Sequence, residues 1–308
     1  MHLGILDFCP IRKGHLPYES IHETIRLAQE ADALGMSRFW LAEHHELAYA
    51  HHAPDIMAAL LAGATDRIRI GVAGMLLKLH SPMRVAKAFR LMESLFPGRI
   101  DLGMAGGEAE PAVIDAMRDR SQPLPEMRAE YPQRVLRLVE LIRGQSPLVF
   151  NPLGTPTPPL WMLGMSSLDT ARLAAHQGMN FGFSLAHPQS RDNPSVTACY
   201  LEEFRPAPHQ PQPGLVVAVT GLCAETEEEA RRLAGAHAEH NREGLALIGN
   251  PAQCRERMEE ICHRYRTQEL VFLDLAPDAE SRLRCYRLLA SELRLSVPAP
   301  APRVEKSA

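Results

Sequence analysis

Hydrophobic residues along this chain gather in short runs that alternate with longer amphipathic segments. Short runs rich in branched and aromatic residues are typical of strands that are buried on both faces. Eight such runs predict strands, at residues 2–7, 38–42, 67–77, 99–105, 159–164, 179–186, 215–223 and 268–275.

The segments between these runs repeat apolar residues at the three- and four-residue spacing of an amphipathic helix. Several also carry end signals, such as Gly35 after the first segment and the capping pattern of Thr226 and Glu229. Helices are predicted at residues 18–34, 53–65, 83–96, 130–143, 167–178, 225–240, 251–266 and 278–295.

Repeated strand–helix units predict a parallel sheet, and eight of them favour closure into a (β/α)8 TIM barrel, which typically needs about 250 residues. An open Rossmann sheet is the alternative, but the G-x-G-x-x-G motif is absent after the first strand, where LDFCPIRKG holds one glycine. We therefore expect one barrel domain over residues 1–296. The proline-rich residues 297–308 are expected to form a flexible tail.

Charge and cysteine content narrow the functional classes. The net charge of -4, with scattered basic residues, gives no footprint for nucleic acid or an anionic membrane. The six cysteines form no C-x-x-C pair, so neither a zinc knuckle nor a disulfide framework is predicted. The first apolar run contains Asp7 and lacks a preceding basic region, which favours a strand over a signal peptide. Because no apolar stretch is long enough to cross a bilayer, we expect a cytoplasmic protein.

The C-terminal ends of the strands form the active-site face of a TIM barrel, so residues at these ends are the candidates for chemistry. The second strand ends in Glu43, His44 and His45, and histidine is well suited to proton transfer near neutral pH. His44 is predicted to point into the mouth of the barrel, although a structural histidine in the core is the alternative. His51 and His52 lie nearby, which makes a metal site an alternative. However, no H-E-x-x-H motif is present, so a metal site is not expected.

Other strand ends offer weaker signals. Gly164, Met165 and Ser166 precede a predicted helix whose N-terminus could bind a phosphate group, unless Ser166 or Ser167 is an ordinary N-cap. Glycines 103, 106 and 107 allow a ligand to approach the backbone or make a turn. Large apolar side chains near the ends suggest an apolar ligand or simply core filling; they are Phe8, Met75, Met104 and Met165. Trp40 and Trp161 are interpreted as core or pocket wall.

Three segments together resemble the luciferase-like flavin-dependent monooxygenases, and the likeness extends over residues 3–294. They read W-L-A-E-H-H at 40–45, H-S-P-x-R-V-A at 80–86 and F-P-G-R-I-D-L-G at 96–103. The resemblance implies reduced FMN, supplied by a separate flavin reductase and held at the barrel mouth. There it reacts with O2 through a C4a-peroxyflavin and oxygenates a small organic substrate, while the protein positions the flavin and excludes water.

The resemblance also assigns roles to residues. His44 falls on the family's catalytic histidine, with Glu43 and His45 expected to support its orientation. A non-proline cis peptide bond is expected at Ala73–Gly74, under the flavin ring and next to Met75. The other residues expected to contact the cofactor are Lys78, Gly106, Gly107, Gly164, Met165 and Ser166.

Departures from the family pattern affect the phosphate end of the flavin. Gly106 stands where the family has a phosphate-binding arginine, Met165 replaces a serine, and Lys78 stands where a proline is common. We hypothesise that Lys78, or an arginine among positions 118, 128 and 134, replaces the missing cation. Backbone N–H groups of Gly106, Gly107 and Ser166 would assist.

The resemblance is compatible with three hypotheses about the function. The first is the FMN-dependent monooxygenase; the second is hydride transfer with the deazaflavin F420 on the same barrel. The third is a non-catalytic partner of an active paralogue, which the missing arginine favours and the retained His44 opposes. A homodimer, or a heterodimer with a paralogue, is expected through the helices after the second and third strands. The sequence does not identify the substrate.

Overall fold

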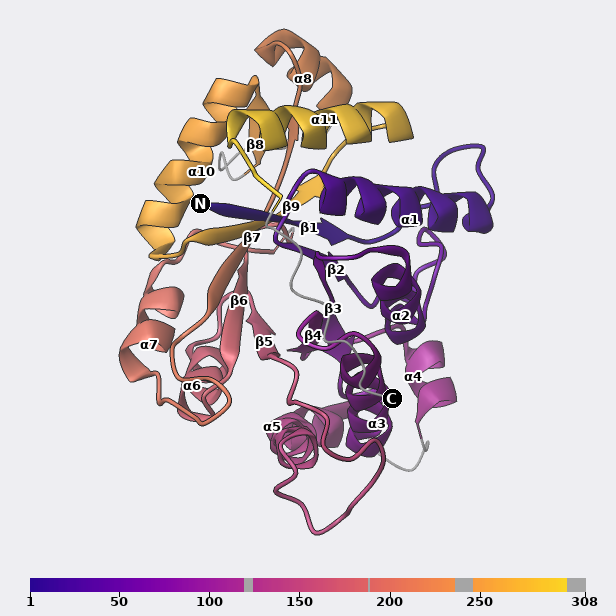
Figure 1. The fold of residues 1–308 in the computed structure, drawn as a ribbon, viewed down its shortest axis with the longest axis vertical. Helices are drawn as coiled ribbons and strands as arrows, with labels where there is room; N and C mark the ends of the chain where they lie inside the picture. Colours follow the sequence, from indigo (N-terminus) through magenta and orange to yellow (C-terminus); the bar gives the residue numbers. More distant parts are fainter. Residues whose placement is uncertain (119–123, 188, 236–245, 298–308) are drawn as a thin grey trace, which may run out of the picture.

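The computed structural model describes residues 1–118, 124–187, 189–235 and 246–297. Eight parallel strands form its centre: β1 His2–Asp7, β2 Arg38–Leu41, β3 Arg69–Leu76, β4 Ile100–Ala105, β5 Leu160–Gly164, β6 Asn180–Ser184, β7 Leu215–Cys223 and β9 Glu269–Asp274. Each strand pairs with its neighbour, β7 pairs with β9, and β9 pairs with β1, so the sheet closes on itself. The predicted (β/α)8 TIM barrel is confirmed (Figure 1).

A ninth strand, β8 Leu247–Gly249, was not predicted because it has only three residues. It pairs with the C-terminal end of β7 and lies outside the closed ring. The eight predicted helices correspond to α1 Pro17–Ala33, α2 Pro54–Ala64, α3 Pro82–Leu95, α5 Leu124–Ile142, α6 Leu168–His176, α8 Glu227–Ala234, α10 Pro251–Tyr265 and α11 Ala279–Glu292.

The helix boundaries differ most from the prediction in α5 and α8. Helix α5 begins at Leu124, before the predicted residue 130, and α8 ends at Ala234 with Gly235 at a φ of +53°. The rest of the predicted 225–240 helix, like the predicted tail beyond Val297, lies outside the described residues. Two helices were missed, α4 Pro111–Met117 and α7 Ser195–Glu203.

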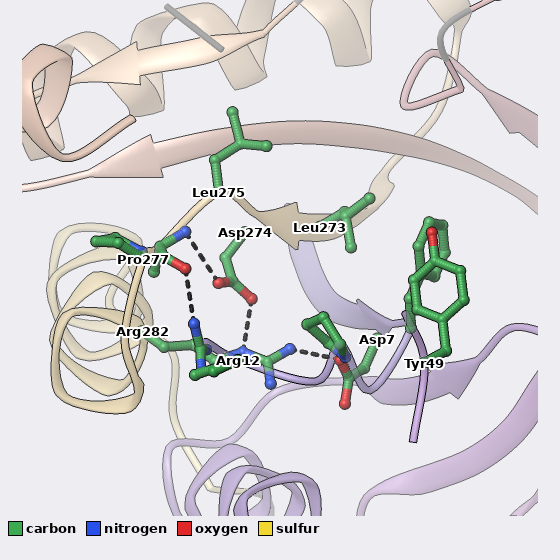
Figure 2. Close-up of a pocket in the computed structure, with 11 residues that line it drawn as sticks. Asp7, Arg12, Tyr49, Leu273, Asp274, Leu275, Pro277 and Arg282 are labelled. Carbon is green, nitrogen blue, oxygen red and sulfur yellow. Dashed lines mark hydrogen bonds and ion pairs between the residues drawn. The ribbon is translucent and has the colours of Figure 1, made fainter. Parts of the chain in front are cut away.

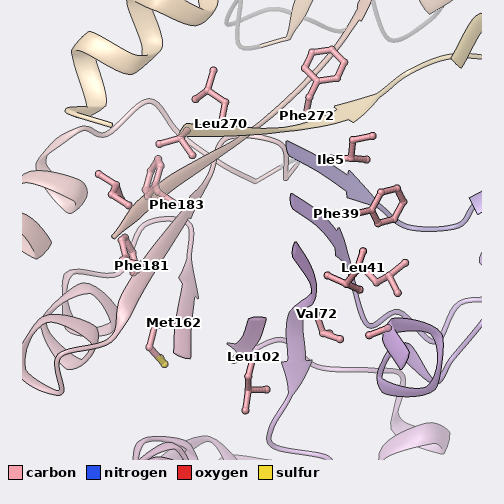
Figure 3. Packing of buried hydrophobic residues seen from close by; sticks show 14 of the residues in the cluster. Ile5, Phe39, Leu41, Val72, Leu102, Met162, Phe181, Phe183, Leu270 and Phe272 are labelled. Atoms are coloured by element: carbon pink, nitrogen blue, oxygen red, sulfur yellow. The ribbon is translucent and has the colours of Figure 1, made fainter. Parts of the chain in front are cut away.

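The main hydrophobic core lies between the barrel and its surrounding helices. Alternate residues of each strand face outward, such as Ile5 in β1, Phe39 in β2 and Phe272 in β9 (Figure 3). These side chains are fully buried against the apolar faces of the helices. Burial of alternate outward positions on every strand fixes the register of the barrel, since a one-residue slip would reverse both faces.

The barrel interior is filled and, near the N-terminal ends of the strands, charged. The rings of Trp40 and Trp161 meet edge to face with centroids 5.0 Å apart, which confirms the interpretation of both tryptophans as core. Beside them Arg38 forms ion pairs of 2.7 Å with both Asp101 and Glu269. This layer fills the barrel interior near the N-terminal ends of the strands, so the interior opens toward the C-terminal mouth.

Among the described residues, no helix combines the length and apolar character needed to cross a lipid bilayer.

Candidate active site

His44 lies just beyond the end of β2, at the barrel mouth. Its ring packs against Phe8, at a centroid distance of 4.5 Å, and against Tyr49, at 4.8 Å. Its Nδ1 lies 3.6 Å from Glu46 Oε2, and its side chain keeps 29% of its exposure. The structure thus places His44 at the barrel mouth, where aromatic neighbours hold the ring and part of it remains exposed.

The surroundings of His44 favour its neutral form. Burial lowers the pKa of His44, the nearby His187 lowers it further, and the carboxylate of Glu46 opposes both. A neutral imidazole can accept a proton at neutral pH, which is what a general base requires.

Glu43 is the centre of a buried hydrogen-bond network. Its Oε1 bonds to His45 Nε2 at 2.9 Å and to His80 Nε2 at 2.7 Å, while its Oε2 accepts from the backbone N–H of Leu76 at 2.8 Å. Burial alone would raise the pKa of Glu43, but the bond from His80 and its partners hold the pKa below its usual value. The carboxylate therefore stays ionised and ties the segment after β2 to the end of β3.

This network corrects one prediction. Glu43 and His45 were expected to orient His44, but their side chains bond to each other, and Glu43 also bonds to His80. The carboxylate within ion-pair distance of His44 is that of Glu46, which the sequence analysis did not select. Glu46 lies further beyond the end of β2 than the three residues selected, so the rule about strand ends gave no signal for it.

A pocket of about 300 Å³ opens beside His44, at the C-terminal ends of β1 and β9. Phe8 and Tyr49, which contact the His44 ring, also line this pocket. Figure 2 shows Arg282 between the carboxylates of Asp7 and Asp274 on one side of the pocket. One side of the pocket is therefore aromatic, and the other is formed by the paired charges of Arg282, Asp7 and Asp274.

The predicted cis peptide bond between Ala73 and Gly74 is present in the structure. A Cβ added at Gly74 would lie 2.7 Å from Leu163 Cδ1 and 2.9 Å from the carbonyl carbon of Gly103. Such distances are shorter than side chains tolerate, so glycine is required where β3 passes so close to β4. Gly74 itself is buried at this point, while Ala73, on the other side of the cis bond, is partly exposed.

Two of the four apolar candidates do not line the mouth. Met75 and Met104 are completely buried in the outer core, facing the helices, so of the two predicted roles for these side chains the structure favours core filling. Phe8 does line the pocket. Met165 is half-buried at the end of β5 and remains a candidate.

Positive charge gathers where the family's arginine is missing. Lys78 is buried, and its Nζ lies 2.8 Å from Glu108 Oε1, while Arg128 binds the same carboxylate through two bonds of 2.6 and 2.8 Å. Hydrogen bonds from Arg128 and then Lys78 lower the pKa of Glu108 to about 2. Next to this cluster lies the ring of Tyr131, 3.2 Å from the position that a Cβ of Gly106 would occupy.

The other two arginines predicted to contact the flavin phosphate, Arg118 and Arg134, differ in their surroundings. Arg134 donates to the backbone carbonyls of Leu77 and His80, so its guanidinium supports the chain after β3. Arg118 follows the last residue of α4; burial lowers the pKa of Arg134, and the charge of Arg118 lowers it further. Of the predicted cations, Lys78 and Arg128 are the two that the structure brings onto one carboxylate.

The residues after β5 form a short exposed connection to α6. Ser167 is the N-cap of this helix, because its Oγ accepts the backbone N–H of Thr170 at 3.2 Å. Ser166 is exposed and Gly164 is half-buried next to the Phe181 ring. The question of which serine caps the helix is therefore answered in favour of Ser167. Within the ranges that the structure covers, no group of His, Cys, Asp or Glu side chains has the geometry of a metal site.

The chain matches known proteins over most of its length. Residues 1–242 fit the family described as luciferase-like monooxygenase. The uncharacterized protein YceB of Bacillus subtilis (strain 168) is 31% identical over 94% of this chain and 98% of its own length. A luciferase-like monooxygenase of Escherichia coli (strain K12) is 31% identical over 75% of this chain and 69% of its own length.

Solved structures share the architecture. Apo-MsnO8 superposes with a TM-score of 0.85 at 31% identity, covering 96% of this chain and 99% of that chain. The oxygenating constituent of 3,6-diketocamphane monooxygenase from the CAM plasmid of Pseudomonas putida, in complex with FMN, gives 0.74 at 17% identity, covering 97% and 99%. An F420-dependent secondary alcohol dehydrogenase gives 0.68 at 16% identity, covering 95% and 99%. At these lower identities, the last two likenesses concern the fold alone.

Proposed function

The chain belongs to the luciferase-like monooxygenase family, and on that premise we propose that it uses reduced FMN and O2 to oxygenate a small organic substrate. The observation that carries the proposal is His44, a partly accessible base whose pKa is lowered by burial and whose ring packs against Phe8 and Tyr49 in the wall of the pocket. A separate flavin reductase would supply the reduced FMN. The direct test is substrate-independent binding of reduced FMN, followed by O2-dependent turnover of the purified protein.

The residues at the mouth fit an FMN molecule. The partly exposed Ala73, joined to Gly74 by the cis bond, offers a surface for the ring, and Lys78 and Arg128 offer positive charge for the phosphate. The hydroxyl of Tyr131 is buried without a hydrogen-bond partner among the described residues, so a phosphate oxygen would satisfy it. Bound there, reduced FMN would supply the electrons that activate O2.

His44 would accept and return one proton beside the reacting atoms. Because Nδ1 lies beside Glu46, Nε2 is the nitrogen left for the substrate. Phe8 and Tyr49 would hold the ring in place and exclude water from one side of the pocket. The aromatic wall suits an organic substrate with an apolar part.

F420-dependent hydride transfer is the second candidate, because enzymes that use F420 share this barrel. Under this hypothesis the protein would bind F420 tightly and would not bind reduced FMN. A non-catalytic partner subunit, the third candidate, would bind neither and would produce no turnover alone.

Lys78→Ala is expected to weaken the binding of reduced FMN by about ten- to a hundredfold, since a charge-assisted phosphate contact contributes about 1.5–3 kcal/mol. Anaerobic calorimetry with FMN and with riboflavin, which lacks the phosphate, would measure it. Riboflavin affinity should stay unchanged. Lys87→Ala, at an exposed position of α3, is the matched control. Unchanged FMN affinity in Lys78→Ala and in single variants of Arg118, Arg128 and Arg134 would contradict the phosphate assignment.

We also propose that the protein dimerises through α2 and α3. These adjacent helices present exposed leucines and an isoleucine in i, i+4 pairs: Ile56 with Leu60, and Leu91 with Leu95. Apolar side chains exposed on adjacent helices are typical of an interface. Leu60→Glu combined with Leu91→Glu should convert a dimer into a monomer in analytical ultracentrifugation, while Leu153→Glu, in the loop before β5, should not. Identical sedimentation of both variants would refute the assignment.

A further inference from the structure

A second cavity, of about 380 Å³, lies at the opposite end of the barrel from His44. It is formed by the C-terminal half of α3, the end of α5 and the segments that lead into β5 and β7. Since these segments precede their strands, the cavity belongs to the N-terminal face. Figure 1 shows α3 and α5 side by side below the barrel, and the two helices pack together. The polar residues that line it are Arg90, Arg143, Thr155, Thr157 and His209.

Both arginines of this cavity lack a neutralising carboxylate among the described residues. Arg143 donates from Nη2 to the carbonyl oxygen of Gly178 at 2.9 Å, and the Arg90 guanidinium lies 5.1 Å from the centre of the Phe150 ring. The Nε atoms of both are buried without a hydrogen-bond partner. Burial lowers the pKa of Arg143, and no acidic side chain opposes this effect.

Desolvating a guanidinium without an anionic partner is unfavourable, so native structures usually pair such groups. Two of them line one cavity here, and none of its described lining residues is acidic. The arrangement therefore favours an anion that reaches both arginines at once.

We propose that this cavity binds the phosphate group of a small ligand. Planar guanidinium groups bind phosphate oxygens through paired hydrogen bonds, and the hydroxyls of Thr155 and Thr157 add donors. The volume lies within the range of small-molecule sites, about 300–1,000 Å³, and exceeds what a phosphate group alone needs. The site is separate from the barrel mouth, so it stands or falls independently of the flavin assignment.

The test is calorimetric titration of the full-length protein with inorganic phosphate and, separately, with glucose 6-phosphate, at constant ionic strength. We expect saturable binding that Arg143→Gln and Arg90→Gln each weaken by about tenfold or more. The matched control is Arg137→Gln, which removes an exposed cation of α5 that is paired with Glu140. It should bind as the wild type does. Tighter binding of glucose 6-phosphate would identify a phosphorylated metabolite as the ligand; equal or tighter binding of phosphate would identify the free ion.

Lys78→Ala separates this cavity from the barrel mouth, because it alters only the mouth. Phosphate binding should persist in Lys78→Ala. The melting temperature of ligand-free Arg143→Gln should equal or exceed that of the wild type, since a desolvated charge is removed, and phosphate should no longer raise it. Absence of saturable binding, or binding lost in Lys78→Ala but kept in both arginine variants, would overturn the proposal. So would an equal loss in Arg137→Gln.

Discussion

Replacing His44 with alanine is expected to lower kcat by about 10²–10⁴-fold, the contribution typical of a positioned general acid–base group. The affinity for reduced FMN should be unchanged, because His44 contacts Phe8, Tyr49 and Glu46 and not the cluster around Lys78. Steady-state turnover with reduced FMN, together with anaerobic titration, would measure both quantities. The exposed His22→Ala on α1 serves as the matched control.

The pH profile separates proton transfer from a structural role. Because the pKa of His44 is lowered by burial, the base is available down to a pH below the ordinary histidine value of about 6.5. Activity should therefore fall as the pH decreases through this lowered pKa. Glu46→Gln removes the carboxylate that raises the pKa, so its acid limb should move to still lower pH. An acid limb that stays in place in Glu46→Gln, with full activity in His44→Ala, would exclude His44 as the base.

Replacing Arg282 with methionine is expected to lower the free energy of unfolding by about 3–5 kcal/mol, because it leaves two buried carboxylates unpaired. Arg282 is buried and bonds to Asp7 and, at 2.7 Å, to Asp274 Oδ2. The hydroxyl of Thr24 donates to the other oxygen of Asp7 at 2.6 Å. This network joins β1, β9, α1 and α11 at the wall of the pocket next to His44 (Figure 2).

Urea unfolding would measure this loss, with Arg284→Met as the matched control on the same helix. Arg284 is half-exposed and pairs with Glu225 and Glu229, so its replacement should change stability by about 0–1 kcal/mol. Adding Asp7→Asn to Arg282→Met should restore part of the loss. Equal effects of Arg282→Met and Arg284→Met would show that the buried network does not stabilise the fold.

The contribution of Asp7 to the free energy of unfolding depends on pH, and the sign of this dependence follows from its pKa. Burial alone would raise the pKa of Asp7, but Arg282 and Thr24 hold it below its usual value. The ionised Asp7 therefore contributes stability that is fully present above the unfolded pKa of about 3.9 and is lost as the pH falls through the lowered folded value. In Arg282→Met the pKa of Asp7 should be raised instead, so the stability difference between variant and wild type should narrow in acid.

The sequence predicted the barrel because every strand carries a buried run and the amphipathic helices carry end signals. It missed α4 because this helix buries none of its residues and so has no apolar periodicity. It missed β8 because three residues are too few to form a pattern. Met104 carried a usable signal: Ile100, Leu102 and Met104 alternate with the inward Asp101. Met75 did not, because a register shift between Val72 and Met75 interrupts the alternation of β3.

The candidate site was predicted only where one short segment contains the chemistry. The resemblance to the family predicted the cis bond at Ala73–Gly74, which the structure contains. His44 was selected because it lies in the segment W-L-A-E-H-H, and its catalytic role stays a prediction. The link between Asp7 and Arg282 joins residues 275 positions apart, and local patterns do not encode such a contact. That Glu46, and not Glu43, is the acidic neighbour of His44 likewise depends on how the segment after β2 bends.

The most direct test of the proposed function is anaerobic calorimetric titration of the purified protein with reduced FMN and, in parallel, with F420. We predict micromolar binding of reduced FMN, with equal affinity in His44→Ala, and no binding of F420. The wild-type protein, without any partner subunit, should form product in an O2-dependent reaction. Binding of F420 without reduced FMN would favour hydride transfer. Binding of neither cofactor would contradict the flavin assignment and favour a partner subunit.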